Sequence, residues 1–198
     1  IARRGMVIIV SDIATLPNNP GLIESLRIEL NSTGWGTLSI MPPKPDLSST
    51  SEDKKNSYAT TLIQRLNSAL VHAQVKDRHV AVILQGKQSA YLIDAFNNKQ
   101  LALPSAIITL DATPAYPNDN DEYPTDYLTL ATQLSKLTLP LLDINNANRL
   151  NSANDLLIRK QLAQKNHHPS YRQLVIYEAT KGTYLTKQIY GWLKSVIR

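Results

Sequence analysis

The sequence predicts an α/β domain in which an open, mostly parallel sheet of about six strands is covered by helices on both faces. Short apolar runs alternate with longer segments of helical periodicity along the whole chain. The apolar runs are nearly continuous, which is typical of strands buried on both faces of a parallel sheet. The length of 198 residues suits one domain, and neither a repeat nor a linker divides it. We therefore expect a single domain over residues 1–198.

The apolar runs and the helical segments follow each other in strict alternation. We expect strands at residues 6–10, 37–41, 80–84, 106–110, 139–142 and 174–177. We expect helices at residues 21–32, 57–76, 89–97, 126–136, 152–166 and 184–197. Because the connections are short, these elements should form right-handed crossovers between parallel strands.

Local signals support these limits. One apolar stripe with helical spacing runs along the second helix, formed by Leu62, Leu66, Ala69 and Ala73. Ser57 and Ser152 stand where a hydroxyl caps a helix start, and Gly34 follows the first helix, where a left-handed residue ends a helix. The segments 42–56 and 113–125 are rich in Pro, Ser, Asn and charge, and we expect surface loops there.

Composition excludes several classes of protein. The chain has no cysteine, which rules out disulfides, thiolate metal sites and a thiol nucleophile. No apolar run approaches the ~20 residues that a membrane helix needs, so we expect no membrane span. The chain begins at Ile1, and we expect it to be part of a longer precursor.

The net charge of +5 is unevenly distributed along the chain. Residues 1–148 carry 12 basic and 14 acidic side chains, whereas residues 149–198 carry nine basic and two acidic ones. The basic residues, Arg159 among them, are spaced singly along the last helices. We interpret them as a solvated helix face, with a docking surface as the alternative.

The third expected strand leads directly into a tight turn and a helix. This is the context of a nucleophile elbow, the G-x-S-x-G motif that presents a serine above the carboxyl end of a strand. Aligned on Gly86, the motif reads Gly86, Lys87, Gln88, Ser89, Ala90. The serine position then holds Gln88, whose amide cannot attack a carbonyl group.

The order of elements resembles the α/β-hydrolase fold entered at its third strand. The sequence is most similar to an uncharacterised family of exported proteobacterial proteins with a hydrolase-like core. The stretches that carry this resemblance are residues 21–30, residues 34–43 and the turn at Gln85 and Gly86. The succession of elements covers nearly the whole chain, and it implies a three-layer hydrolase-like architecture.

The resemblance also implies where catalytic residues should lie. Hydrolases of this fold commonly carry His-Gly after the first strand here, where this chain has Ser11 and Asp12. The acid of the triad should follow the penultimate strand, near Asp143. The histidine should follow the last strand, but no histidine occurs after His168. The resemblance therefore implies a hydrolase fold without a catalytic triad, and we predict no catalytic residue.

What remains is a vestigial pocket. Its candidate residues are Ser11, Asp12, Gly86, Lys87, Gln88, Ser89 and Asp143. Ser89 is expected to cap the helix start. The four histidines, His72, His79, His167 and His168, show no metal-ligand pattern.

Other ligand sites find little support in the sequence. The acidic segment with Asp119, Asp121, Glu122 and Asp126 suggests calcium, but it lacks the glycine and glutamate of an EF-hand. No dinucleotide or P-loop motif occurs, and no basic-aromatic pattern indicates a nucleic-acid groove. We predict no cofactor, no metal and no nucleic-acid partner.

These observations predict a non-catalytic module that binds proteins or has a structural role. The resemblance suggests the periplasm and an oligomer or larger cell-envelope assembly, such as a secretion system. The last helix is the candidate docking face, with Lys187, Lys194 and Arg198 beside Tyr190 and Trp192.

Two alternatives stay open. One is an esterase-like hydrolase with a rebuilt site that uses Ser11 or Ser89 with Asp12 or Asp143. The other is a small-ligand site formed by Gln88, Asp12 and Lys87.

Overall fold

The computed structural model describes residues 3–12, 21–44, 52–114, 125–147, 152–176 and 182–197. Six parallel strands form one sheet in the order β2-β1-β3-β4-β5-β6. The strands are β1 (Gly5–Val10), β2 (Trp35–Ile40), β3 (Val80–Gln85), β4 (Ala106–Leu110), β5 (Leu141–Asn146) and β6 (Tyr171–Ile176). The helices are α1 (Gly21–Ser32), α2 (Glu52–Lys76), α3 (Gln88–Asn97), α4 (Thr125–Lys136), α5 (Ser152–Lys165) and α6 (Gly182–Val196).

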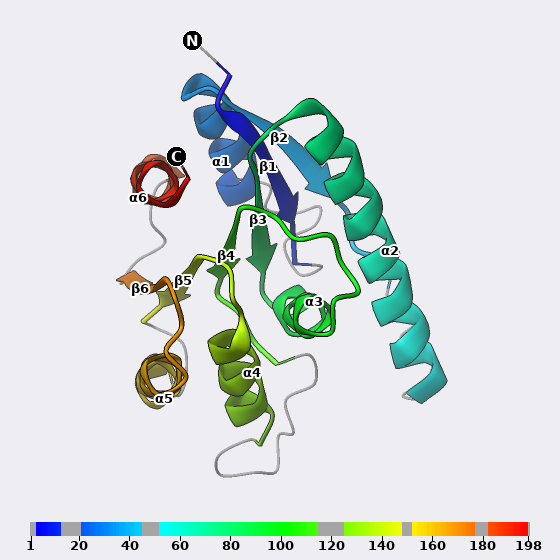
Figure 1. Cartoon of the computed structure of the whole chain (residues 1–198), viewed down its shortest axis with the longest axis vertical. Helices are drawn as coiled ribbons and strands as arrows, with labels where there is room; N and C mark the ends of the chain where they lie inside the picture. The colour runs from blue at the N-terminus through cyan, green and yellow to red at the C-terminus, as the bar shows by residue number, and fades with distance from the viewer. Residues whose placement is uncertain are drawn as a thin grey trace.

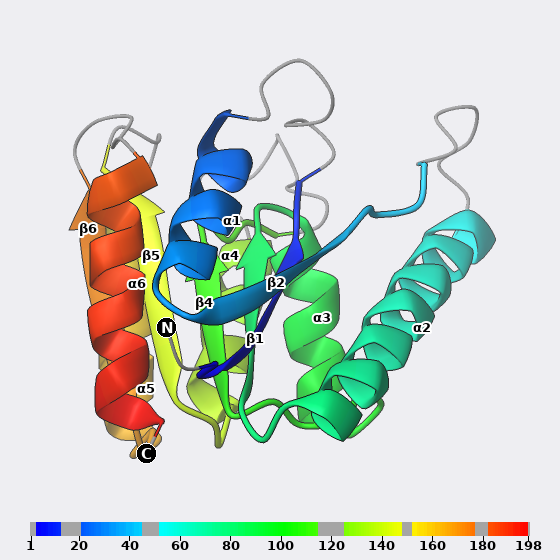
Figure 2. The same ribbon diagram turned by 90° about the horizontal axis from the view of Figure 1, so that it is seen from above.

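The helices form a layer on each face of the sheet, which confirms the predicted fold class. Helices α1 and α6 lie side by side on one face, and α2, α3, α4 and α5 follow one another across the other (Figures 1 and 2). The strand order reverses between β1 and β3, because the chain first crosses from β1 to β2 and then returns past β1. In open α/β sheets, sites form at the carboxyl ends of the strands at such a reversal.

Alternate residues of the central strands divide the core into two apolar clusters. Ile8 and Val82 pack towards α2, α3 and α4, whereas Val7 and Ile83 pack towards α1 and α6. Leu62, Leu66 and Ala73 of the predicted stripe on α2 are fully buried, and Ala69 is partly buried against the same cluster. Ile189 and Trp192 of α6 are buried in the core, so Trp192 does not belong to an exposed docking face of the last helix.

Several element limits differ from the sequence-based expectation: β2 begins at Trp35 instead of residue 37, and β6 begins at Tyr171 instead of residue 174. Helix α2 begins at Glu52, so Ser57 lies inside the helix and is not its cap. Strand β5 runs over 141–146 instead of 139–142, because its polar residues have buried partners that are described below.

Gly34 has a φ of 95° after α1, which confirms its expected left-handed conformation. Within the described residues, no helix has the length and apolar character required to cross a membrane.

Candidate active site at the β3–α3 turn

The turn at the carboxyl end of β3 has the geometry of a nucleophile elbow. Gly86 adopts a φ of 60°, and Lys87 is already in right-handed helical conformation before α3 begins at Gln88. The Gly86 amide donates to the Leu110 carbonyl at 3.0 Å, and the Gly86 carbonyl accepts from the Ser89 amide at 3.2 Å. The sharp turn therefore has one residue in the left-handed region, and that residue is Gly86.

This geometry corrects the alignment that placed Gln88 in the nucleophile position. The serine of an elbow occupies the strained residue of the turn. In this chain that residue lies two positions before Gln88. Gln88 instead lies in the first turn of α3, is 2% exposed, and accepts a hydrogen bond from the Tyr58 hydroxyl at 2.7 Å. Its side chain ties α3 to α2, which the sequence could not distinguish from a ligand contact.

Asp12 fills the space above the turn. A Cβ atom built on Gly86 would overlap the Asp12 carboxylate oxygen and would lie 2.6 Å from its Cγ atom. The Asp12 amide, one of the donors that an oxyanion would need, donates to Gln85 Oε1 at 3.1 Å. The carboxyl ends of β1 and β3 thus meet as predicted, but a carboxylate occupies the place of a nucleophilic side chain.

The two serines predicted at this site are both buried. Ser89 is fully buried, and its hydroxyl donates to the Leu84 carbonyl at 3.2 Å. This bond fastens α3 to the preceding strand, so the hydroxyl does not cap the helix as predicted. Ser11 is 5% exposed at the end of β1, and Lys87 is exposed.

Asp143 does not lie at a strand end. It is the third residue of β5, is fully buried, and faces the α2–α5 side of the sheet. Its carboxylate accepts hydrogen bonds from Thr109 Oγ1 at 2.7 Å, Asn145 Nδ2 at 2.8 Å and Tyr171 Oη at 2.9 Å. The resemblance implied a triad acid near Asp143, and Asp143 was a candidate of the vestigial pocket, but these partners hold its carboxylate inside the domain.

Arg159 completes this buried polar cluster from α5. Its Nη1 atom donates to Asp143 Oδ1 at 3.3 Å and to Asn145 Oδ1 at 3.3 Å. Its Nη2 atom donates to the Ala112 carbonyl at 2.9 Å and pairs with Asp155 Oδ2 at 2.6 Å. The expectation of a solvated Arg159 is corrected here, since the residue is 1% exposed. The four-residue spacing from Asp155 was a sequence signal for this pair, but it indicates a surface pair equally well.

The charges of the cluster stabilise each other. Burial alone would raise the pKa of Asp143, but the Arg159 charge and the three hydrogen bonds lower that pKa below its ordinary value. Burial and the neighbouring Asp143 charge raise the pKa of Tyr171, so its phenol stays protonated and donates. The cluster is therefore a closed ion-pair network.

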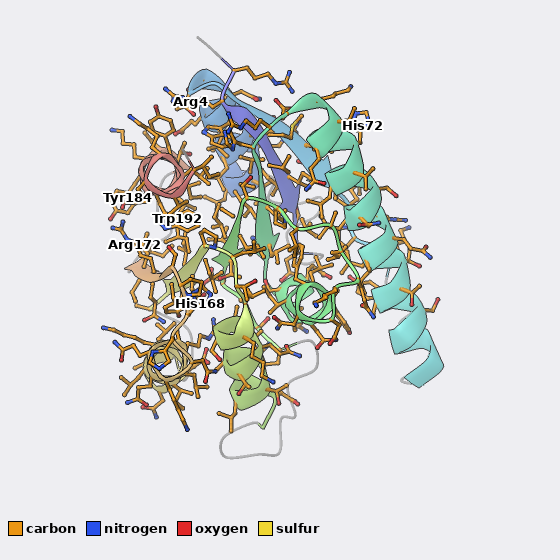
Figure 3. All side chains as sticks on the ribbon, viewed as in Figure 1. Arg4, His72, His168, Arg172, Tyr184 and Trp192 are labelled. Atoms are coloured by element: carbon orange, nitrogen blue, oxygen red, sulfur yellow. The ribbon has the colours of Figure 1, made fainter. Side chains whose placement is uncertain are left out.

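The predicted histidines lie away from the turn. His72 is on the exposed side of α2, and His168 lies close before β6 (Figure 3). His79 directly precedes β3 and His167 directly precedes His168, so these three lie before the amino ends of their strands. Asp119, Asp121 and Glu122 of the calcium hypothesis lie outside the described residues. Across the part of the chain that the structure describes, no group of three acidic or histidine side chains is arranged to hold a metal ion.

A groove of about 660 Å³ lies between α2, α3 and α4. Tyr91, Asp94 and Gln133 line it, and Gly86 and Asp12 do not. The groove is therefore separate from the elbow.

Comparison with solved structures agrees with this fold. The esterase domain of a Rhodothermus marinus protein is 12% identical with a TM-score of 0.66, over 98% of this chain and 88% of that chain. Est1E from Butyrivibrio proteoclasticus is 12% identical with a TM-score of 0.64, over 100% of this chain and 90% of that one. A structure described under LipS and LipT, two metagenome-derived lipolytic enzymes, is 10% identical with a TM-score of 0.63, over 98% of this chain and 95% of that one. At these identities the likeness concerns the fold alone.

Sequence comparisons add the family. No curated protein matches the chain. A family profile matches residues 2–57 and 47–195, which together include almost the whole sequence. The chain therefore belongs to the family described as "Protein of unknown function (DUF3530)", and its fold is that of the α/β-hydrolases.

Proposed function

We propose that this chain is a non-catalytic α/β-hydrolase-like domain that acts as a protein-binding or structural module. One observation carries the proposal: the Asp12 carboxylate fills the space into which a nucleophile at the elbow residue, Gly86, would project. A glycine has no side chain to attack a substrate, and the hydroxyl of Ser89, in the first turn of α3, is fully buried. Lys87 is exposed, but it lies one residue beyond the turn and on the helix start.

The missing base supports the same proposal. A serine nucleophile needs a histidine that takes its proton, and loss of either member of the pair removes most of the activity. The sequence has no histidine after His168, and the four histidines lie at other places in the fold. Asp143, the third candidate, lies within β5, and Thr109, Asn145, Tyr171 and Arg159 occupy its carboxylate oxygens, so none is directed at a histidine.

The two alternatives receive less support. A rebuilt hydrolase would need a reachable hydroxyl, but Ser89 is fully buried and Ser11 is 5% exposed. A small ligand bound by Gln88 would have to displace the Tyr58 hydroxyl from the Gln88 amide. The periplasmic location and a place in a secretion system stay predictions that rest on the resemblance to exported proteins.

Labelling with a fluorophosphonate probe tests the proposal. We expect no covalent labelling of the native protein above the level of the heat-denatured protein, because neither buried serine has a base to activate it. The Ser89→Ala and Ser11→Ala variants serve as matched controls, with circular dichroism to confirm that each is folded. Labelling of the native protein that disappears in one variant would identify a nucleophile and contradict the proposal.

A further inference from the structure

The end of the domain opposite the elbow carries basic side chains in excess. In a parallel sheet with helical crossovers, the strands begin and the helices end at the same end of the domain. Figure 2 shows this end, with the last turn of α2 beside the loop that leads from α3 to β4. The residues there that we compare are 3–5, 30–35, 73–80, 95–106, 134–141, 163–172 and 193–197. Their exposed cations are Arg3, Arg4, Lys76, Arg78, Lys99, Lys136, Lys165, Arg172 and Lys194.

The carboxylate among these residues is already paired. It belongs to Asp77, which is 7% exposed and accepts hydrogen bonds from Arg3 Nε and Nη2, each at 2.6 Å. Asp94, one turn before the end of α3, accepts from Asn98 Nδ2 at 3.0 Å and from Gln133 Nε2 of α4 at 2.9 Å. Over the described residues, neither carboxylate therefore forms an ion pair with the lysines at this end.

The helix dipole explains only part of this charge. The cations in the last turns of helices, where the dipole favours them, are Lys76, Lys136, Lys165 and Lys194. Arg78 and Lys99 lie in connections outside the helices. Lys99 adopts a φ of 59° after α3, a left-handed conformation that glycine or asparagine usually takes at the end of a helix. A cation stands there although a smaller residue would fit the backbone better.

Two exposed aliphatic side chains lie on the same two segments as these cations. Val75 is 83% exposed at the end of α2, and Leu103 is 54% exposed in the loop between α3 and β4. Gln74 Nε2 donates to the Leu103 carbonyl at 2.8 Å, and the Ser105 amide donates to the Val80 carbonyl at 2.7 Å. These bonds hold the two segments side by side. We call their exposed surface the basic corner, formed by Val75, Lys76, Arg78, Lys99 and Leu103.

We propose that the basic corner binds the surface of an anionic phospholipid bilayer. Its three cations would pair with lipid phosphates, while Val75 and Leu103 would enter the region between the headgroups. The inference goes beyond the proposed function and does not depend on it. The elbow, at the opposite end of the strands, would stay exposed to solvent in this orientation.

The side chains of the basic corner favour a lipid surface over other anionic partners. Contacts with nucleic-acid phosphates need cations but gain nothing from exposed aliphatic side chains, and single strands are bound by stacking on aromatic rings. Protein interfaces are enriched in aromatic residues and depleted in lysine. The basic corner has two lysines and two aliphatic residues, and none of its members is aromatic.

Sedimentation with sucrose-loaded vesicles tests this inference. The vesicles contain phosphatidylglycerol and phosphatidylcholine in equal parts, and the bound fraction of the whole chain gives a partition coefficient at low and high salt. The charge variant of the basic corner is Lys76→Glu/Arg78→Glu/Lys99→Glu. Its matched control reverses exposed cations elsewhere and has the same net charge: Lys44→Glu/Lys160→Glu/Lys187→Glu.

A second pair of variants tests the aliphatic side chains. The apolar variant is Val75→Ser/Leu103→Ser. Its control is Ile28→Ser/Leu157→Ser, at positions that are 62% and 54% exposed on other helices. Circular dichroism confirms that each variant is folded.

We expect the charge variant to lower the partition coefficient about thirtyfold or more, because each basic residue close to an anionic bilayer contributes roughly fivefold. Its control should lower the coefficient no more than about threefold, because distant charges act only through a field that salt screens. The apolar variant should lower it about fivefold or more at high salt as well, because burial of apolar side chains is not screened. The Ile28→Ser/Leu157→Ser control should leave it unchanged.

Four results would overturn the inference. They are no binding of the native protein to the anionic vesicles, equal binding to vesicles of phosphatidylcholine alone, equal loss in the charge variant and its control, and an apolar variant that binds as well as the native protein. Tighter binding of the native protein to a duplex DNA or to polyglutamate would assign the basic corner to a nucleic acid or an acidic protein instead. The labelling experiment above decides the proposed function separately, because the basic corner and the elbow lie at opposite ends of the sheet.

Discussion

Two polar regions of this domain, the β3–α3 turn and the Asp143–Arg159 cluster, differ in what their side chains can do. The turn occupies the place where hydrolase chemistry occurs, yet it presents a glycine under a carboxylate. The cluster contains Asp, Arg, Tyr and Asn side chains typical of an active site, yet it is buried and its groups bind one another. A concentration of buried polar residues therefore indicates a functional site only when some of their hydrogen-bonding capacity is left for a ligand.

The largest loss of stability is expected when the Asp143–Arg159 cluster is broken. Replacing Arg159→Leu leaves Asp143 and Asp155 without their cation in a buried environment. We expect the free energy of unfolding to fall by about 3–5 kcal/mol, which is the usual consequence of removing one partner from a buried ion pair. Urea denaturation followed by circular dichroism measures the change.

The matched control for this substitution is Arg172→Leu on β6. Arg172 is exposed, so its replacement should change the free energy of unfolding by less than about 0.5 kcal/mol. Equal effects of the two substitutions would contradict the view that the cluster is a structural element.

A smaller effect is expected from restoring a side chain to the elbow. Gly86→Ser should destabilise the domain by about 1–2 kcal/mol from the left-handed backbone alone, and the overlap with Asp12 adds to this. The double variant Asp12→Ala/Gly86→Ser should recover the steric part of the loss. Neither variant should hydrolyse a p-nitrophenyl ester, because no histidine is placed to activate the new hydroxyl. Esterase activity in the double variant would show that a general base lies within reach of the turn.

The smallest expected effect is the loss of stability at acid pH that comes from protonation of Asp143. The folded-state pKa of Asp143 is lowered, so its contribution to stability is complete above its unfolded pKa of about 3.9 and is lost as pH falls below that value. We expect the stability difference between the native protein and Asp143→Asn to be constant from pH 5 to 7 and to shrink as pH falls below about 4. Unfolding curves at each pH measure it. A difference that persists unchanged at pH 3 would mean that the carboxylate charge does not stabilise the fold.

The periodicity of the sequence determined the fold class, the order of the elements and most of their limits. Continuous apolar runs such as Val80–Leu84 are typical of strands buried on both faces, and their alternation with helical segments predicted a parallel sheet. The absence of a histidine between His168 and Arg198 is likewise read from the sequence alone, and it led us to predict that the domain has no conventional triad. The run at residues 139–142 was located less well, because β5 continues through polar residues whose burial depends on a distant arginine.

The contacts between polar side chains could not be read from the sequence and depend on the packing of distant elements. Asp12 and Gly86 are 74 positions apart, and the close approach of the Asp12 carboxylate to Gly86 depends on the register between β1 and β3. Arg159 is buried because Asp143, Asn145, Asp155 and the Ala112 carbonyl converge on it from separate elements. A local pattern records which face of an element is apolar, but the partners of a polar group are set by long-range packing. The sequence therefore determined the order of the strands and helices. The three-dimensional contacts determined that the Asp12 carboxylate lies against Gly86 at the elbow and that Asp143 on β5 pairs with Arg159.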